Sequence, residues 1–384
     1  MRKRRSRCAA GWLSCLVVWA CVLCGPVEAR ERMQSSEPSS GPEQVEPLAG
    51  PPVRPWPPTQ PVRTIGFGSC VRENRPAPIL RTIASDPPDV YVFLGDNIYG
   101  DTEDPAVFRA KYGRLLAIPG FRELRERSTV LAVWDDHDYG RNDAGEEFPA
   151  KELARRHFLT FWAEPRDSPR WHTDGNYGAV VLGPPGRRVQ FLLLDTRWSR
   201  SPLKRLPQRS EFGPYAPDED PSARVLGEAQ WSWLTQQLQV PAELRVVASS
   251  IQVLADEHHF EKWGNFPREK QRLLELLDGS GGAVVVLSGD RHRGEISRAT
   301  LPSGRRLYDI TSSALNQGSG QPSNEPNALR RGSHVTEPHT AVLEIDWEEG
   351  VVRMQLRRES GSVITELSER LSAMSAGGGG GAGQ

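Results

Sequence analysis

Six short apolar runs, rich in Val, Ile and Leu, constrain the fold of this chain more than any other feature. They cover residues 64–67, 90–94, 130–133, 189–194, 246–248 and 284–287. Runs of this length and composition predict buried strands. Segments with a helical period lie between several of them, at residues 106–116, 151–162, 228–238 and 267–277. The alternation predicts α/β layers, and later runs at residues 307–310, 341–345 and 351–356 predict a more antiparallel end of the domain.

The predicted domain is bounded by two segments whose composition does not support a core. Residues 30–61 hold nine prolines among Ser, Gly and Glu, which favours a disordered, extended linker. Residues 371–384 end in GGGGGAGQ and predict a disordered Ser/Gly-rich tail. The domain therefore covers residues 62–370, and no internal repeat or second linker interrupts its sequence.

Residues 1–29 indicate an export signal. They combine the basic start MRKRRSR, an apolar stretch over residues 8–24 and a small residue before Arg30. The stretch is shorter than the roughly 20 apolar residues of a membrane-spanning helix. We therefore expect cleavage, no transmembrane anchor in the mature chain, and an extracytoplasmic location, periplasmic or secreted. Acylation at Cys21 and twin-arginine export through Arg4-Arg5 remain open alternatives for the export route.

Charge and cysteine content exclude several classes of partner and cross-link. Removal of residues 1–29 takes away five basic residues and one acidic residue, so the formal net charge falls from −1 to −5. Proteins that bind nucleic acid carry a basic excess, and none is expected here. Cys70 is the only cysteine after residue 29, so the mature chain forms no intrachain disulfide. The sequence does not indicate an oligomeric state.

Polar side chains follow five of the six apolar runs. Ligands of α/β proteins bind at the carboxyl ends of strands, although a single Asp at such a place is more often a helix cap or turn residue. Several carboxylates gathered at one edge repel one another unless cations neutralise them. Carboxylate and imidazole suit Zn, Mn, Ca or Fe, and a thiolate favours Fe or Zn. The polar residues after the runs are Cys70, Asp96, Asp135, Asp136, Asp195 and Asp290. A dinuclear metal site is therefore expected where Asp96, Asp136, Asp290 and His292 come together, with Cys70 as a possible thiolate ligand.

Seven fragments carry a resemblance to a known family. They are GSC (68–70), FLGDNIYGDT (93–102), WDDHDYGRND (134–143), LLDTRW (193–198), GEAQWSWL (227–234), EKWGNFP (261–267) and LSGDRHRGEIS (287–297). In this order they resemble the alkaline phosphatase D (PhoD-like) family of the calcineurin-like metallophosphatase superfamily, over most of residues 64–317. The resemblance implies a four-layer α/β/β/α sandwich. It also implies a dinuclear centre that hydrolyses phosphate mono- or diesters outside the cytoplasm.

The resemblance also implies a ligand set. Cys70 stands where the family has a cysteine ligand to ferric iron. Asp96 resembles the Asp that bridges two metals, and Asp136 the residue that binds the second metal. Asp290 and His292 resemble a Gly-His-x-His element in which Asp replaces the first His, a change that favours a harder cation.

Asn97 is a further candidate ligand and the main departure from the family pattern. Founding members of the family carry Tyr at this position, where the phenolate ligates iron, and an amide cannot replace a phenolate. Iron with calcium, which Cys70 favours, therefore competes with zinc or manganese as the expected metals.

The mechanism implied by the resemblance is in-line attack of a metal-bound hydroxide on phosphorus. His137 would protonate the leaving alkoxide or stabilise the transition state, and Asp138 or Asp135 would orient its imidazole. Three arginines have two interpretations. They either donate charge-assisted hydrogen bonds to phosphate or form salt bridges to Asp143, Asp195 or Glu295. These candidates are Arg141, Arg197 and Arg291, and Asn142 and Trp263 are further candidates for substrate contact or the pocket wall.

The leading hypothesis is an exported metal-dependent phosphatase or phosphodiesterase. The alternative is a catalytically silent protein that binds metal or phosphate on the same fold. The intact set of Asp96, Asp136, His137, Asp290 and His292 favours the enzyme. A Ser/His/Asp hydrolase is disfavoured because no Gly-x-Ser-x-Gly turn precedes a plausible helix.

Overall fold

The computed structural model describes residues 45–319, 324–375 and 377. The predicted signal sequence lies outside these residues. The part from Val45 onward forms one compact unit. None of the helices in the described part of the chain combines the length and apolar character that a bilayer span requires.

The first sheet has the strand order β15, β14, β13, β1, β2, β3. β1, β2 and β3 run parallel, and β13, β14 and β15 extend the sheet from β1 in antiparallel fashion. Its strands are β1 (Thr64–Gly68), β2 (Val90–Leu94), β3 (Thr129–Val133), β13 (His339–Asp346), β14 (Val351–Arg358) and β15 (Val363–Arg370).

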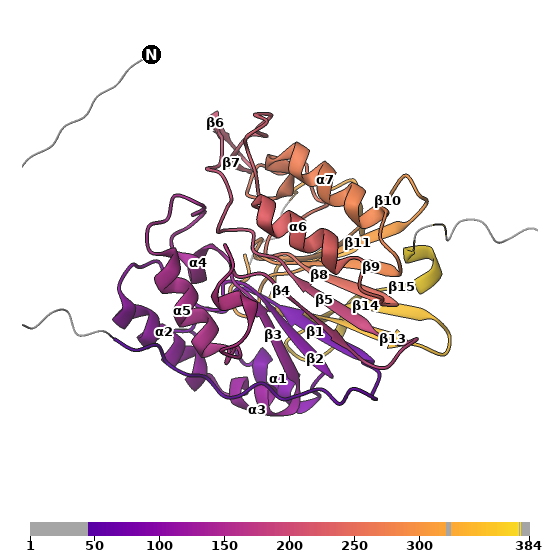
Figure 1. The fold of residues 1–384 in the computed structure, drawn as a ribbon, viewed down its shortest axis with the longest axis horizontal. Helices are drawn as coiled ribbons and strands as arrows, with labels where there is room; N and C mark the ends of the chain where they lie inside the picture. The colour runs from indigo at the N-terminus through magenta and orange to yellow at the C-terminus, as the bar shows by residue number, and fades with distance from the viewer. Residues whose placement is uncertain (1–44, 320–323, 376, 378–384) are drawn as a thin grey trace, which may run out of the picture. The chain divides into compact units, whose positions relative to one another are not determined.

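The second sheet has the order β12, β10, β11, β9, β8, β5, β4. Its strands are β4 (Gly178–Leu182), β5 (Val189–Leu193), β8 (Leu244–Ala248), β9 (Ala283–Ser288), β10 (Gly294–Thr300), β11 (Arg306–Ser312) and β12 (Arg330–Val335). β5, β8, β9 and β11 run parallel. The predicted antiparallel end is found for β13 and β14, whereas β11 pairs antiparallel with β10 on one side and parallel with β9 on the other. A hairpin of β6 (Arg205–Ser210) and β7 (Gly213–Tyr215) projects from the domain (Figure 1).

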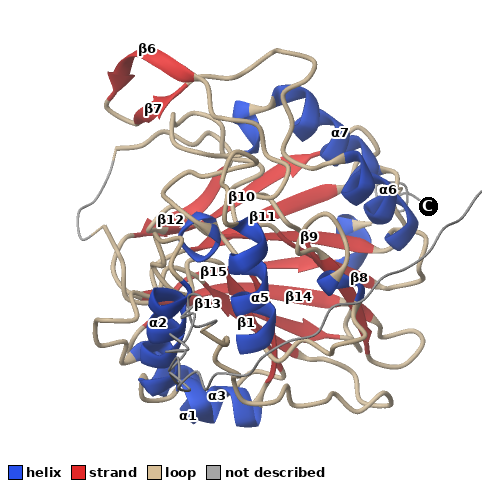
Figure 2. Ribbon diagram, turned by 60° about the vertical axis from the view of Figure 1, so that its left-hand side comes forward, coloured by secondary structure: helices blue, strands red, loops and turns tan. Residues whose placement is uncertain are grey.

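Helices cover the outer faces of both sheets (Figures 1 and 2). α1 (Ile79–Ser85), α2 (Pro105–Ala117), α3 (Phe121–Arg127) and α5 (Lys151–Phe161) pack on the first sheet. α6 (Glu228–Gln237) and α7 (Pro267–Asp278) pack on the second. Short helical turns are α4 (Asp136–Tyr139), η1 (Pro169–Trp171), η2 (Trp263–Asn265) and η3 (Leu371–Met374). The predicted four-layer α/β/β/α sandwich is confirmed.

Burial on both sides explains why the strand sequences are continuously apolar. In β2, Val92 faces the core between the sheets, whereas Tyr91 and Phe93 pack against the helices. In β9, Val285 faces that central core and Val284 faces α6 and α7. Because successive side chains of a strand point to opposite faces, a strand between two apolar layers needs apolar residues at every position.

Two segments predicted to be disordered pack against the domain where the structure describes them. Residues 45–61 form no helix or strand, yet Arg109 Nη1 donates to the carbonyl of Glu46 over 2.7 Å and Thr129 Oγ1 donates to that of Arg54 over 2.9 Å. At the other end, Met374 is fully buried, and Ser375 forms an isolated antiparallel β-bridge with Ala283. Proline removes backbone donors but leaves carbonyl acceptors, which explains how the first segment is held.

We call residues 45–61 the strap. Its main buried contact is with Arg125 of α3. The guanidinium of Arg125 is almost fully buried and donates to the carbonyls of Pro51, Phe161 and Trp162. Among the described residues it has no carboxylate partner, and burial lowers its pKa to about 10. The side chain therefore joins the strap to the end of α5 through carbonyl oxygens alone.

The Arg125→Met variant should release the strap. Buried carbonyls that lose their donor cost about 1–3 kcal/mol, so we expect a lower midpoint of urea unfolding and faster proteolysis within residues 45–61. Arg122→Met, at an exposed position of the same helix, is the matched control. Equal proteolysis of the two variants would show that Arg125 does not hold the strap.

Candidate functional site

The carboxyl ends of four parallel strands from the two sheets meet at one edge of the sandwich. Side chains that follow β1, β2, β3 and β9 form three groups there, and the ligand atoms within each group lie within 4.8 Å of one another. The groups share Asp96 and Asp136, so they form one continuous set. We call it the strand-end cluster, and it comprises Cys70, Asp96, Asp135, Asp136, His137, Asp290 and His292.

The cluster has buried oxygen atoms without hydrogen-bond partners. Asp96 Oδ1, Asp136 Oδ1 and Asp135 Oδ2 have none within the described residues. Burial raises the pKa of Asp96 well above its usual value, and Cys70 and Asp136 raise it further. Buried carboxylate oxygens are normally paired, and bound cations would pair them here. The donor set therefore fits metal ions.

Strained backbone turns place several of these side chains. Cys70, Asp96, Asp290 and His292 have φ values of 61°, 50°, 66° and 52°, in the left-handed region. Each such residue costs about 1–2 kcal/mol unless it is glycine. Strain of this kind gathers at functional sites, where the surrounding structure maintains it.

Glycines precede both motif aspartates because neighbouring strand ends approach closely at this edge. A Cβ on Gly95 would lie 2.4 Å from Cβ of Asp135, on the neighbouring strand end. A Cβ on Gly289 would lie 2.6 Å from Ser69 Oγ and 2.9 Å from the carbonyl oxygen of Leu94. Only glycine permits these approaches, and the one at Gly289 brings the ends of the two sheets together.

His137 is oriented by Asp101, not by the residues that the sequence suggested. Its Nδ1 donates to Asp101 Oδ1 over 2.6 Å, and its ring packs against Tyr99 at a tilt of 36°, with centroids 4.3 Å apart. Burial lowers the pKa of His137, but the carboxylates of Asp136, Asp96 and Asp101 outweigh burial and raise the pKa to about 10. The prediction that Asp138 or Asp135 orients the imidazole is wrong.

Asp138 instead stabilises the loop that follows β2. Its carboxylate accepts the backbone amides of Asn97, Ile98 and Asp135 over 3.1–3.2 Å. Asn97 Nδ2 donates to the same carboxylate over 3.1 Å and to the carbonyl of Val133 over 3.0 Å. Asp138 is therefore committed to loop contacts, and the proposed role of Asn97 as a ligand stays a prediction.

Tyr99 is a site residue that the sequence reasoning missed. Its hydroxyl lies 3.1 Å from His292 Nε2, and burial, followed by Cys70, raises the pKa of the phenol well above its usual value. The phenol that Asn97 cannot supply is thus present two residues later. The signal was present in the fragment FLGDNIYGDT, which has a tyrosine two positions after Asn97. The loop after β2 can bring a side chain at this position back to the end of the strand.

Asp143 is a second missed residue, because it supports Asp136. Its amide donates to Asp136 Oδ2 over 2.6 Å, and its own carboxylate accepts the hydroxyl of Tyr215 from the base of the β6–β7 hairpin. Asn142 points to the same carboxylate, with Nδ2 donating to Asp143 Oδ2 over 2.7 Å. The hairpin is therefore connected to the strand-end cluster.

The three predicted phosphate-binding arginines are all paired with carboxylates. Arg197 is fully buried between Asp135 and Glu261, with Nη1 donating to Glu261 over 2.6 Å. Arg291 donates to Glu325 over 2.8 Å, and Arg141 pairs with Glu103 at the surface. Salt bridges were the alternative interpretation, but the partners differ from those expected, which were Asp143, Asp195 and Glu295.

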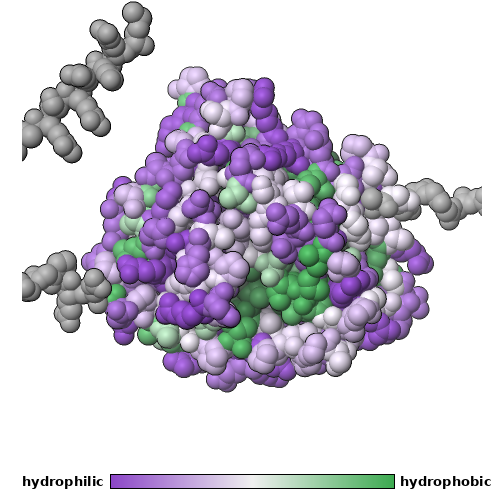
Figure 3. Space-filling view, in the orientation of Figure 1, coloured by the Kyte–Doolittle hydropathy of each residue, from purple (hydrophilic) through white to green (hydrophobic). Residues whose placement is uncertain are grey.

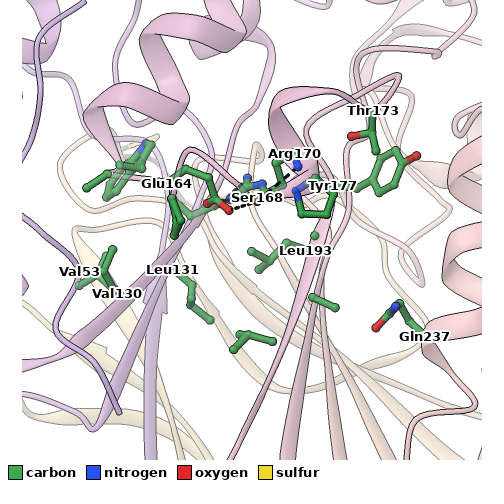
Figure 4. A pocket seen from close by; sticks show the side chains of 18 of the residues that line it. Val53, Val130, Leu131, Glu164, Ser168, Arg170, Thr173, Tyr177, Leu193 and Gln237 are labelled. Carbon is green, nitrogen blue, oxygen red and sulfur yellow. Dashed lines mark hydrogen bonds and ion pairs between the residues drawn. The ribbon is translucent and has the colours of Figure 1, made fainter.

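Trp263 lies in the core, so its prediction as a pocket wall is wrong. The side chain is fully buried, packs edge-on against Trp231 and donates from Nε1 to Ser249 Oγ over 3.0 Å. A groove of about 660 Å³ lies elsewhere, between the free edges of β3 and β4. Figure 3 shows apolar surface in this region, and Figure 4 shows Leu131 and Leu193 beneath the Glu164–Arg170 ion pair. No residue of the strand-end cluster lines it.

Comparisons with known proteins agree with this geometry. Residues 177–364 match the family model described as PhoD-like phosphatase. A structure of PhoD superposes with a TM-score of 0.67 at 16% identity, covering 84% of this chain and 72% of that chain. No curated protein sequence matches this chain.

Two further solved structures share the fold. A dimetal phosphatase from Danio rerio has a TM-score of 0.53 at 17% identity, covering 81% of this chain and 100% of that chain. GAP50, described as the anchor in the inner membrane complex of Plasmodium, has a TM-score of 0.52 at 14% identity, covering 81% and 90%. At these identities the structural likeness shows the fold alone.

Proposed function

We propose that the chain is a phosphoesterase of the PhoD-like phosphatase family, whose model matches residues 177–364, and that it hydrolyses phosphate esters with metal ions held by the strand-end cluster. One observation carries this proposal. Buried ligand atoms from four strand ends form overlapping groups, and several of their oxygens have no hydrogen-bond partner in the described part of the chain. Buried carboxylates without partners destabilise a folded protein unless bound cations neutralise them.

The cluster offers two chemically different sides. On one side, the thiol of Cys70, the phenol of Tyr99 and the imidazole of His292 offer ligands that suit iron or zinc. On the other side, Asp135, Asp136 and Asp290 offer oxygen ligands alone, which suit calcium, magnesium or manganese. We therefore propose two unlike metal ions, with iron and calcium favoured; Asp96, which belongs to two of the ligand groups, would help to hold them.

The cations would polarise the phosphoryl oxygens and lower the pKa of a bound water. The protein itself supplies the proton for the leaving group. His137 has Nδ1 held by Asp101, so Nε2 is the nitrogen that can donate to the departing alkoxide oxygen. Asp101 fixes the orientation of the ring and stabilises its protonated form.

The surrounding side chains keep the cluster in one geometry. Arg197 neutralises part of its negative charge through Asp135, while the amide of Asp143 fixes Asp136. Asp138 secures the loop that carries Tyr99. These contacts give the cluster a fixed shape before substrate binds, which lowers the reorganisation needed in the reaction.

The location of the activity is part of the proposal. Residues 1–29 have the composition of an export signal, and we propose that the enzyme acts outside the cytoplasm, in the periplasm or after secretion. Turnover of p-nitrophenyl phosphate compared with turnover of its bis ester distinguishes phosphate monoesters from diesters as the substrate class.

Turnover of p-nitrophenyl phosphate and of its bis ester by the purified protein tests the proposal. We expect hydrolysis of at least one of them, its loss after dialysis against a chelator, and its recovery when metal ions are restored. Turnover that persists after complete chelation would contradict metal-dependent hydrolysis. Metal binding without turnover of either ester would instead support the silent metal-binding alternative.

A further inference from the structure

Two arginines near the strand-end cluster differ from Arg141, Arg197 and Arg291 in their partners. Arg72 and Arg75 follow Cys70 in the loop after β1, and neither forms an ion pair with any described residue. The acidic residue between them is already engaged. Glu73 accepts the amide of Tyr99 over 3.1 Å and faces Lys111 and Arg114. The two guanidinium groups therefore lack a carboxylate partner.

The same neutral atom holds both guanidinium groups. Arg72 Nε donates to Gln317 Oε1 over 3.1 Å, and Arg75 Nη1 donates to that oxygen over 2.8 Å. Two cations that share one amide oxygen repel each other, and an amide does not neutralise either of them. Such a pair is suited to an anion that accepts hydrogen bonds from both side chains.

The position of Arg72 connects this pair to the proposed reaction centre. Its guanidinium carbon lies 4.3 Å from the centre of the Tyr99 ring, and the hydroxyl of Tyr99 lies 3.1 Å from His292 Nε2. One side chain thus separates the guanidinium from the strand-end cluster. Arg72 is partly buried, whereas Arg75 is exposed, so the pair extends from the cluster toward solvent.

The loop that carries the pair is fixed by Asn316, which follows β11. Asn316 Oδ1 accepts the amide of Arg72 over 2.7 Å, and its Nδ2 donates to the carbonyls of Arg72, Arg75 and Pro76 over 3.0–3.3 Å. The amide of Asn316 also donates to the carbonyl of Cys70 over 3.4 Å. The arginines are thereby held in place relative to Cys70 before any ligand binds.

We propose that Arg72 and Arg75 form an anion-binding pair that holds the phosphoryl group of the substrate beside the strand-end cluster. Arg72 donates hydrogen bonds to a non-bridging phosphoryl oxygen, and Arg75 adds positive charge on the solvent side. This inference rests on the proposed function for its substrate. It assigns phosphate binding to these two residues in place of Arg141, Arg197 and Arg291, whose guanidinium groups are already paired.

The variants Arg72→Gln, Arg72→Lys and Arg75→Gln test the pair in the metal-loaded, full-length protein. The probes are p-nitrophenyl phosphate or its bis ester as substrate and inorganic phosphate as ligand, measured both as an inhibitor and by calorimetry. For Arg72→Gln we expect about a 10- to 100-fold lower kcat/KM and a similarly weaker affinity for phosphate. Arg72→Lys should recover part of the loss, and exposed Arg75→Gln should lose about 2- to 5-fold.

Arg81→Gln is the matched control, because Arg81 is an exposed arginine of α1 without an ion pair among the described residues. It should match the wild type in every measurement, and metal content should be equal in all variants. Phosphate affinity in Arg72→Gln equal to that in Arg81→Gln would overturn the pair. If the wild type hydrolysed no ester, the proposed function would fail, while the calorimetric comparison would still decide whether these arginines bind phosphate.

Discussion

The Asp96→Asn variant should lose bound metal and phosphatase turnover together. Asp96 belongs to two of the three ligand groups, and its Oδ1 has no partner within the described residues. An amide is a weaker ligand than a carboxylate and carries no charge. Metal ions contribute several kcal/mol to transition-state stabilisation, so we expect turnover to fall by at least about 10³-fold.

Stability measurements make this prediction sharper. Because burial raises the folded pKa of Asp96 above the ordinary value of 3.8, this carboxyl binds its proton more tightly in the folded apoprotein than in the unfolded chain. The contribution of Asp96 to the stability of the chelated wild type should therefore decrease as pH rises above about 4. Asp96→Asn removes this contribution, so its apoprotein should be the more stable of the two near neutral pH.

Asp104→Asn is the matched control for Asp96→Asn. Asp104 caps the exposed start of α2, where Asn serves nearly as well as Asp. It should retain metal and turnover. An Asp96→Asn protein with normal metal content would show that Asp96 is not a ligand.

The His137→Ala variant should separate catalysis from metal binding. The ring is held by Asp101 through Nδ1 and packs against Tyr99, so we assign it to proton transfer. Loss of a general acid lowers turnover by on the order of 10² or more, whereas metal content should stay near the wild-type value. The effect should be smaller for a substrate with a good leaving group, such as p-nitrophenolate, than for an alkyl ester.

Asp101→Asn is the companion variant, because it retains the imidazole and removes only the carboxylate that orients it. We expect turnover to fall by about 10- to 100-fold, which is the range for residues that orient a ligand or catalytic side chain by hydrogen bonding to it. His137 lies within 4.8 Å of Asp96 and Asp136, close enough to bind a cation. Loss of metal in His137→Ala would therefore assign His137 as a ligand and not as the proton donor.

The layers and the strand-end positions could be predicted from the sequence because both depend on local pattern. Continuous apolar runs identified β2 and β9, and the motif positions of Asp96 and Asp290 followed directly from where those runs end. The parallel pairing of β11 with β9, beside its antiparallel pairing with β10, could not be predicted, because the pattern of Arg306–Ser312 does not specify which strands flank it.

The supporting contacts could not be predicted because they join residues far apart in the chain. Arg197 and Glu261 are 64 positions apart, and no periodicity relates them. Asp101 and Tyr99 lie in an irregular loop, where the path of the backbone decides which side chain reaches His137. Trp263 was misassigned because its loop composition resembles that of a pocket wall, whereas the ring fills the space beneath α6 and α7.

The central claim is that the strand-end cluster holds metal ions, and metal content per chain tests it most directly. Elemental analysis of the wild-type protein, purified without chelators, should give about two metal ions per chain, in line with two-metal hydrolases. Iron with calcium is the composition that the ligand set favours. A protein that contains no metal, and takes up none when iron, calcium, zinc and manganese are offered, would contradict the account.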